Sequence, residues 1–264
     1  MLTNESSTSR KSSMKKYSSV IEDHSVFKND FFEVWSKQPP RTGLAAALLF
    51  QIQAFCAATR KDGQLVKALQ GIDKAASESV SVIIASEQGH GIALSVMCGF
   101  ILSCTPGNQG TIPDQVKEID EFLREKSIEE LGVELLSETR ELIKLFEPIK
   151  HTNRSEIMSA LGVRLAVEIL ANRQIIPGEL QAFIDSKKYV LKGKPIELTS
   201  PKMNYLREHA GEYGAEQEHE KKMFSVLLAA VEETDLPVVV NGSIQMCDAL
   251  EKLYNKMKAH LVER

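Results

Sequence analysis

An apolar stretch between residues 43 and 104 is the strongest constraint on how this chain folds. Within it, apolar side chains recur every three or four positions, as at Leu65, Leu69, Ile72, Ala76 and Val80. This spacing places them on one face of a helix. We therefore predict helices over 43–60, 64–88 and 92–104, with Gly89-His90-Gly91 separating the last two. Strongly apolar helices so close together are expected to form the hydrophobic centre of the molecule.

The remaining chain shows the same helical period, interrupted by Pro and Gly. Pro113 is expected to begin a helix, Ser127 to cap the next one through a capping box with Glu130, and Ser243 to begin the last helix. Two short runs, 189–191 and 196–198, flank Lys-Gly-Lys-Pro and predict one small β-hairpin. There is no βαβ alternation and no repeat at a solenoid period. The sequence therefore predicts an all-α fold of about ten helices with at most one hairpin.

Composition shifts divide the chain into three parts. Residues 1–24 are rich in Ser, Thr, Lys and Asn and have too little apolar surface to offset the entropy of ordering, so we expect a disordered tail. The segment 148–153 is the best boundary between an N-terminal helical lobe (25–150) and a C-terminal helical lobe (151–264). Ser12, Ser13 and Ser18 lie near basic residues and are the predicted phosphorylation sites in the tail.

Composition also narrows the class of protein. A chain of 264 residues with 43% hydrophobic residues buries a sizeable core without staples. The net charge of −4 argues against a surface that coats nucleic acid throughout. The four cysteines show no C-x-x-C spacing, so we expect buried free thiols in a reducing, cytoplasmic setting. The apolar segments are shorter than a bilayer requires, so we predict a soluble protein with no membrane span.

Two E-x-x-H tetrapeptides, Glu87–His90 and Glu216–His219, match a known metal-ligand spacing. In four-helix metalloproteins Glu and His at i and i+3 hold iron or manganese, and two further helices each add one Glu. Two features argue against such a site here. The first copy runs into Gly91, which suggests a helix end, and the second lies in the highly charged stretch 207–222, typical of a solvated face. We therefore predict no metal site and no cofactor.

The segment 187–207 is the best candidate for contact with an anionic partner. It combines basic side chains that neutralise phosphates with tyrosines that stack on unpaired bases. The candidate residues are Lys187, Lys188, Tyr189, Lys192, Lys194, Lys202, Tyr205 and Arg207. A solvated surface with no partner is the alternative interpretation.

No common catalytic signature is present: the chain lacks the P-loop, G-x-G-x-x-G, H-E-x-x-H and G-x-S-x-G motifs. We therefore name no catalytic residue and expect a non-enzymatic binding or assembly protein, whose partner is another protein or its own protomers. The second hypothesis is an RNA-binding, nucleocapsid-like assembly protein in which Arg164 or Arg173 joins the basic segment in a cleft between the lobes. The third is a metal-dependent helical-bundle enzyme or a secreted effector.

Overall fold

The computed structural model describes residues 19–263 except 62, 109, 148–152 and 211–213. The protein is 78% helical with one two-stranded antiparallel sheet, which confirms the all-α prediction. Ser12, Ser13, Ser18 and most of the predicted tail lie outside the described residues. The expected end of the tail at residue 24 is wrong, because residues 19–22 are helical and Ile21 is buried in the core.

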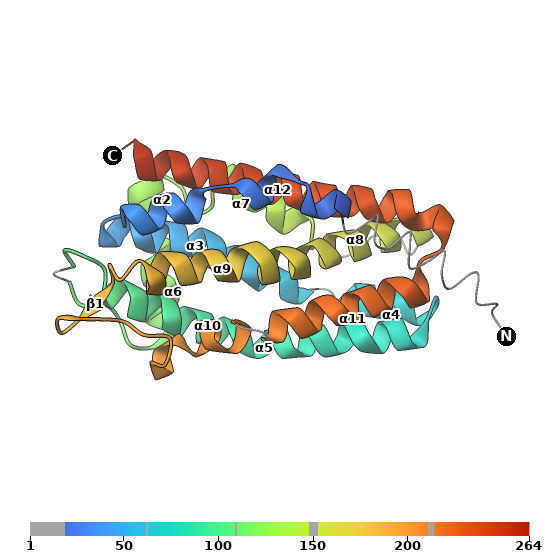
Figure 1. Ribbon diagram of the computed structural model, residues 1–264, viewed down its shortest axis with the longest axis horizontal. Helices are drawn as coiled ribbons and strands as arrows, with labels where there is room; N and C mark the ends of the chain where they lie inside the picture. Colours follow the sequence, from blue (N-terminus) through green and yellow to red (C-terminus); the bar gives the residue numbers. More distant parts are fainter. Residues whose placement is uncertain (1–18, 62, 109, 148–152, 211–213, 264) are drawn as a thin grey trace.

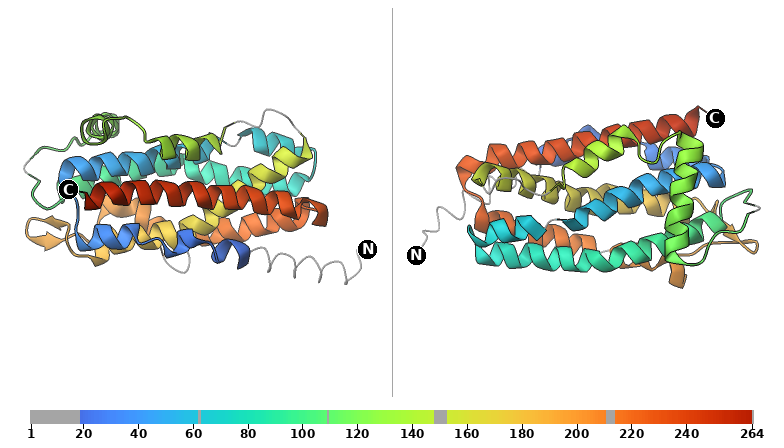
Figure 2. Two further views of the ribbon diagram at one scale, coloured as in Figure 1. Left: turned by 90° about the horizontal axis from the view of Figure 1, so that it is seen from above. Right: turned by 180° about the vertical axis from the view of Figure 1, so that it is seen from behind.

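Ten helices run through the described residues when α8 and α9 count as one rod. Most run along the long axis of an elongated bundle (Figure 1), whereas α6 lies across the others at one end (Figure 2). The bounds are α2 Phe31–Lys37, α3 Thr42–Ala58, α4 Gly63–Gln70, α5 Lys74–Ser103, α6 Val116–Leu131, α7 Ser137–Lys144, α8 Arg154–Leu170, α9 Ile176–Leu180, α10 Asn204–His209, α11 Ala215–Ala230 and α12 Leu236–Val262.

The hydrophobic core is shared by both halves of the chain. One cluster of buried side chains extends from Ile21 to Met257. Helix α12 lies along α8 and also contacts α2 and α7, while α11 packs against both α5 and α8. The predicted boundary between lobes falls largely on 148–152, outside the described residues. Helices from the two predicted lobes therefore interleave around one core.

Helix α5 is longer than the sequence suggested. The chain breaks at residues 71–73, where Asp73 accepts a hydrogen bond from the backbone N–H of Ala76 at 2.7 Å and caps the helix. The helix then continues through Gly89 and Gly91 to Ser103. The predicted break at 89–91 is wrong, because glycine lowers helix propensity without forbidding a helical backbone. Glu87 and His90 consequently lie in a helix interior.

At three other places, the structure does not begin a helix at the predicted residue. Helix α6 begins at Val116, after Pro113, and contains Ser127, whose buried hydroxyl donates to the carbonyl of Glu134 at 2.7 Å instead of capping a new helix. Gly132, with φ of 74°, ends α6. The last helix begins at Leu236, because Pro237 fits the first turn, where no backbone donor is needed.

The rod from Arg154 to Asp185 contains two π-helical turns, Ala171–Ile175 and Gln181–Asp185, before and after α9. In the first turn the N–H of Ile176 reaches the carbonyl of Ala171, five residues back. This wider turn directly precedes Pro177, which has no N–H to donate. The rod therefore passes a proline without a break.

The predicted hairpin is present and smaller than expected. Strands β1 (Val190–Leu191) and β2 (Lys194–Pro195) pair antiparallel. Lys192 and Gly193 connect them with φ values of 50° and 79°, as in a type I′ turn. The hairpin projects at one end of the bundle (Figure 1).

Two helical stretches, Thr42–Gln70 and Lys74–Ser103, are long and apolar enough to cross a bilayer by length and composition alone. In the most apolar window of each, 67% and 35% of the residues are buried inside the protein. The core helix of a soluble protein passes the same test, so the absence of a membrane span stays a prediction.

The crossing of α8 and α12 depends on two glycines. A Cβ atom on Gly162 would lie 2.0 Å from the carbonyl oxygen of Val239, and one on Gly242 would lie 2.2 Å from that of Ser159. The Ser243 hydroxyl also donates to the Gly162 carbonyl at 2.6 Å. The two backbones are thus too close for any side chain at these positions.

We predict that Gly162→Ala lowers the free energy of unfolding by roughly 1–3 kcal/mol, because the methyl group meets backbone that no rotamer change moves away. Urea unfolding measures the change. Gly89→Ala is the matched control: a Cβ there meets nothing within 4 Å, so the better helix former raises stability by up to ~1 kcal/mol. Equal effects of the two substitutions would contradict this account of the crossing.

Candidate metal centre

Six ionisable side chains from four helices meet inside the bundle. None is more than 15% exposed, and charged groups at such depth require a compensating partner. Helix α5 supplies one E-x-x-H pair and α11 the other, each with its two side chains on one face because they are three residues apart. The six residues are Glu87 and His90 on α5, Glu168 on α8, His209 on α10, and Glu216 and His219 on α11.

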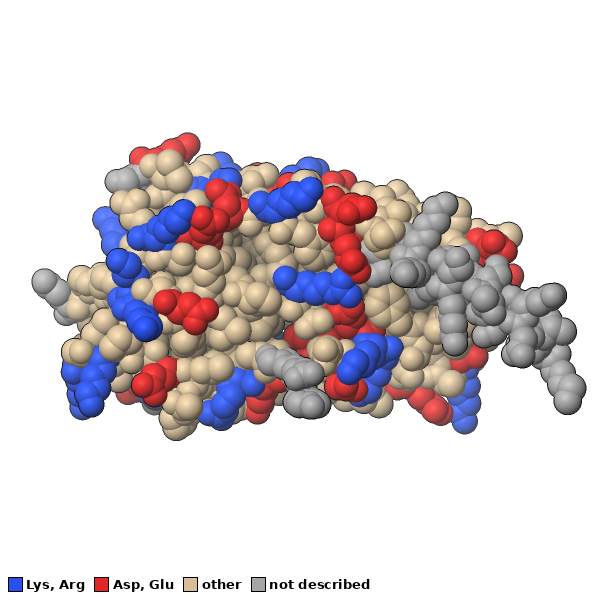
Figure 3. All heavy atoms as spheres, in the orientation of Figure 1, with Lys and Arg blue, Asp and Glu red and all other residues tan. Residues whose placement is uncertain are grey.

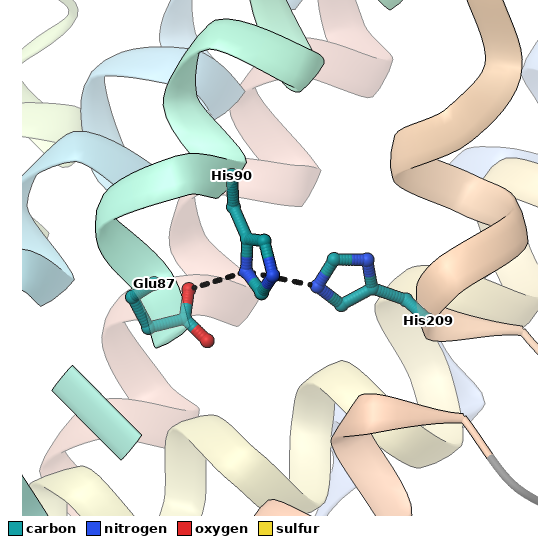
Figure 4. Close-up of side chains that lie close together, drawn as sticks. All are labelled: Glu87, His90 and His209. Carbon is teal, nitrogen blue, oxygen red and sulfur yellow. Dashed lines mark hydrogen bonds and ion pairs between the residues drawn. The ribbon is translucent and has the colours of Figure 1, made fainter. Parts of the chain in front are cut away.

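Glu87, His90 and His209 form the first group, with His90 in the middle (Figure 4). His90 Nδ1 lies 3.3 Å from Glu87 Oε2 and 3.1 Å from His209 Nε2. His209 Nδ1 is 2.5 Å from the backbone carbonyl oxygen of Tyr205, which only accepts, so the proton of neutral His209 is on Nδ1. Burial lowers the pKa of His209 to about 4. His209 therefore presents a lone pair on Nε2 to the cluster.

Glu87, Glu216 and His219 form the second group. His219 Nδ1 lies 3.4 Å from Glu87 Oε1 and 4.0 Å from Glu216 Oε2, and Glu168 Oε2 is also 3.4 Å away. On its other side, His219 Nε2 is 2.9 Å from the Ser86 hydroxyl. That hydroxyl donates to the carbonyl of Ile83, so it accepts the Nε2 proton.

This arrangement leaves His219 Nδ1 facing three carboxylates, with no hydrogen-bond partner among the residues that the structure describes. A bare lone pair there would meet only negative oxygens at close range. The atom therefore requires a cation, either a proton of its own or a metal ion. The orientation that Ser86 imposes is the kind of support that fixes a metal-binding histidine.

The carboxyl groups of the cluster differ in the direction in which their pKa values are shifted. Burial raises the pKa of Glu87, but the hydrogen bond from His90 and the charges of Arg164, His90 and His219 outweigh it and lower that pKa to about 2. Burial and the neighbouring charges of Glu168 and Glu87 raise the pKa of Glu216 well above its ordinary value. Without a metal, Glu216 therefore holds a proton that a bound cation would displace.

Glu168 has a permanent positive partner. Arg164, one turn earlier on α8, places Nη2 2.8 Å from Glu168 Oε1 and donates from Nη1 to the carbonyl of Thr59 at 2.6 Å. Both side chains are almost completely buried. The ion pair fixes one oxygen of Glu168 while the other, Oε2, faces His219.

The spacing of these atoms suits metal coordination. Metal–ligand bonds of about 2.1 Å place two ligand atoms about 3.0 Å apart in an octahedron and about 3.4 Å apart in a tetrahedron. The contacts around Glu87, His90, His209 and His219 fall between 3.1 and 3.4 Å. The first and second groups each keep their ligand atoms within 4.8 Å of one another, and both use Glu87. The geometry thus fits two ions that share Glu87.

A cavity of about 40 Å³ adjoins the cluster. Four residues of the cluster line it: Glu87, His90, Glu168 and Glu216. Its lining also includes the apolar side chains of Phe55, Cys56, Leu94, Val167, Ala171, Ile175 and Ile176. A site for one water needs about 10–15 Å³, so there is room for a ligand of a few heavy atoms.

The structure reverses the sequence interpretation of both E-x-x-H pairs. The first pair lies within α5, and the second is buried, although 207–222 was expected to form a solvated face. Periodicity misled here because Glu216, His219 and Glu220 face inward while Glu218 and Lys221 stay outside. Glu168 was missed; a glutamate and an arginine one turn apart in the apolar sequence of α8 were its signal. His209 had no comparable signal.

The structure agrees only in part with the prediction that residues 187–207 form a surface for an anionic partner. Lys187, Lys188, Lys192, Lys194, Lys202 and Arg207 are exposed, and Figure 3 shows basic side chains at the hairpin end of the bundle. Tyr189 is fully buried and accepts a hydrogen bond from the Trp35 indole at 2.5 Å, while Tyr205 packs on His209 inside the cluster. The expected stacking of bases on these two rings is therefore wrong. Binding of an anionic partner by the exposed side chains stays a prediction.

The two arginines expected to support RNA binding are committed to ion pairs. Arg164 is buried with Glu168, and Arg173 pairs with Glu220 and with Glu22.

The cysteines agree more closely with the prediction of buried free thiols. Cys98, Cys104 and Cys247 are buried and free, and Cys56 is partly buried beside the cavity. Burial, together with the charges of Glu179 and Glu87, raises the pKa of the Cys56 thiol.

Comparison of the chain with protein-family models, curated proteins and solved structures finds no match in any of the three. The function of the protein is therefore inferred from the chemistry of the cluster.

Glu179, on α9, is a buried carboxyl group outside the cluster of six side chains. It is 1% exposed, its Oε2 has no hydrogen-bond partner in the described part of the chain, and burial raises its pKa to about 8. The folded state thus keeps a proton that the unfolded chain releases above its ordinary pKa of 4.5. Stability contributed by this proton is complete below pH 4.5 and is lost as the pH rises toward 8.

We predict that Glu179→Gln stabilises the protein increasingly as the pH rises from 5 to 8, because the amide has no proton to lose. The difference in the free energy of unfolding from wild type should grow by roughly 3–4 kcal/mol across this range. Urea unfolding at pH 5, 6.5 and 8 measures it, with exposed Glu218→Gln as control. A difference that does not change with pH would show that Glu179 is ionised in the folded state.

Proposed function

We propose that this protein binds two transition-metal ions, iron or manganese, in the buried carboxylate–histidine cluster and acts there as a metal-dependent helical-bundle enzyme. The observation that supports this most is the pair of overlapping ligand groups that share Glu87. Of the three hypotheses from the sequence, the metal-dependent bundle is thus the one that the geometry favours.

The ligand atoms divide between two ions. Glu87 Oε2, His90 Nδ1 and His209 Nε2 surround the first position. Glu87 Oε1, Glu168 Oε2, Glu216 Oε2 and His219 Nδ1 surround the second. The two oxygens of Glu87 thus face different positions, as a bridging carboxylate does.

The charge of the cluster supports occupation by cations. Three carboxylates meet two permanently charged side chains, Arg164 in an ion pair with Glu168 and Arg60 in the lining of the same cavity, so the fully deprotonated cluster keeps an excess of negative charge. Without metal, protons must compensate for it, and the raised pKa of Glu216 favours a proton there. Two divalent ions replace these protons, and binding is therefore coupled to proton release.

The donor atoms favour iron or manganese. All proposed ligands are carboxylate oxygens or imidazole nitrogens, the set found in di-iron and di-manganese bundles. The Cys56 sulfur lies beside the cavity but stays a protonated thiol, because a buried thiolate is unfavourable there.

The adjoining cavity provides space for a substrate next to the proposed ions. Six side chains do not fill two six-coordinate ions, so positions toward the cavity remain for water or another small ligand. A bound metal ion acidifies water or polarises a coordinated group. The apolar side chains of Phe55 and Leu94 limit access of bulk water and favour a small organic substrate.

The other two hypotheses keep the status of predictions. The exposed lysines of the hairpin are compatible with an anionic partner, and a metal centre does not conflict with protein binding elsewhere on the surface. Neither hypothesis accounts for the burial of three glutamates and three histidines in one place.

Metal content tests the proposal. Protein stripped with chelator and reloaded with Fe²⁺ or Mn²⁺ without oxygen should bind about two equivalents per chain, the stoichiometry of a two-metal site, by elemental analysis. Glu87→Ala removes the shared ligand and should reduce both equivalents, whereas His209→Ala should mainly empty the first position.

Glu78→Ala is the matched control, because Glu78 lies on the same helix with its side chain 67% exposed. This variant should retain the full metal content. Wild-type protein that binds less than about half an equivalent of either metal would refute a two-metal centre. So would Glu87→Ala protein that binds as much as the control.

A further inference from the structure

Two arginines line the cavity beside the cluster, and they differ in their partners. Arg164 is held by Glu168 and by the Thr59 carbonyl. Arg60 forms no ion pair with any described residue, although Glu87, Glu168 and Glu216 line the same cavity. Its Nε is buried and has no hydrogen-bond partner among the described residues. Arg60 therefore has hydrogen-bonding capacity that no described residue uses.

The position of Arg60 is built into the fold. Arg60 lies in the short 3-10 turn Thr59–Lys61 that follows α3. Its guanidinium lies against α5 at Gly91, where a Cβ atom would be 2.0 Å from Nη1 and 2.4 Å from Cζ. Any other residue at position 91 would displace this guanidinium. Glycine in the middle of α5 thus places a positive group one residue beyond the proposed ligand His90.

The size and charge of the cavity limit which anion fits. A guanidinium presents parallel N–H donors that match a carboxylate. Phosphate has no apolar part to pack against the apolar side chains of the cavity, so a carboxylate with a short alkyl chain is favoured. The cavity holds only a few heavy atoms, and its lining includes the apolar side chains of Phe55, Leu94 and Val167.

We propose that Arg60 binds the carboxylate of a short aliphatic acid that occupies the cavity as the substrate of the metal centre. This inference rests on the proposed function and specifies its substrate class. The carboxylate pairs with Arg60, and the alkyl chain lies against the apolar side chains next to the open coordination positions. Arg60 is a specificity-determining residue in this arrangement and is not a metal ligand.

Calorimetric titration of metal-loaded protein with propionate tests the inference, with acetate and inorganic phosphate as comparison ligands. Wild-type protein should bind propionate, and phosphate more weakly. Arg60→Met keeps the length of the side chain without its charge and should weaken propionate binding by about tenfold or more, the effect of losing a charge-assisted pair. Arg60→Lys keeps the positive charge without the parallel donors, and its affinity for propionate should lie between those of wild type and Arg60→Met.

Arg124→Met, on the exposed surface of α6, is the control and should bind propionate as wild type does. Metal content, measured on the same samples, should be unchanged in all Arg60 variants. Full metal content with equal propionate binding by wild type and Arg60→Met would overturn the role of Arg60 and leave the metal centre intact. Tighter binding of phosphate, or no binding of propionate by metal-loaded wild type, would overturn the ligand class. Wild-type protein without metal would overturn both proposals.

Discussion

His219 Nδ1 faces carboxylate oxygens of Glu87, Glu168 and Glu216 inside the bundle. This contact is the constraint on which the rest of the site depends. The free energy of burying so much negative charge is prohibitive unless cations lie among the oxygens. Arg164 is paired with Glu168 and Arg60 lines the same cavity, and the remaining positive charge must come from protons or metal ions. The helices that converge here are therefore held together by groups that are stable only when a cation is present.

Several irregularities of the fold support this convergence. Helix α5 continues through two glycines, so that Glu87 and His90 stay on one face, and Gly91 leaves room for Arg60. The π-helical turn Ala171–Ile175 contributes two residues to the cavity wall, at a position where such turns often mark functional sites. Within the same turn, Asn172 and Arg173 bind Glu220 on α11 and fix that helix against α8.

Local sequence patterns predicted the fold class well and the site poorly. Apolar residues at helical spacing are sufficient for an all-α fold, and the Lys192-Gly193 turn is sufficient for a hairpin. The patterns failed where tertiary packing overrides local preference. The low helix propensity of Gly91 predicted a helix end, but in the structure its missing side chain leaves room for Arg60. The charged stretch around Glu216 is half buried because it covers the cluster. His209 reaches the site through α10, whose position depends on contacts distant in sequence.

The most direct test of the central claim is an anomalous diffraction map of crystals loaded with Mn²⁺ or Fe²⁺. We expect two peaks, about 3.5–4 Å apart as in known two-metal sites. One should lie among Glu87, His90 and His209, and the other among Glu87, Glu216 and His219. Water or empty space at both positions under saturating metal, with the six side chains unmoved, would contradict it and show that protons alone balance the buried charge.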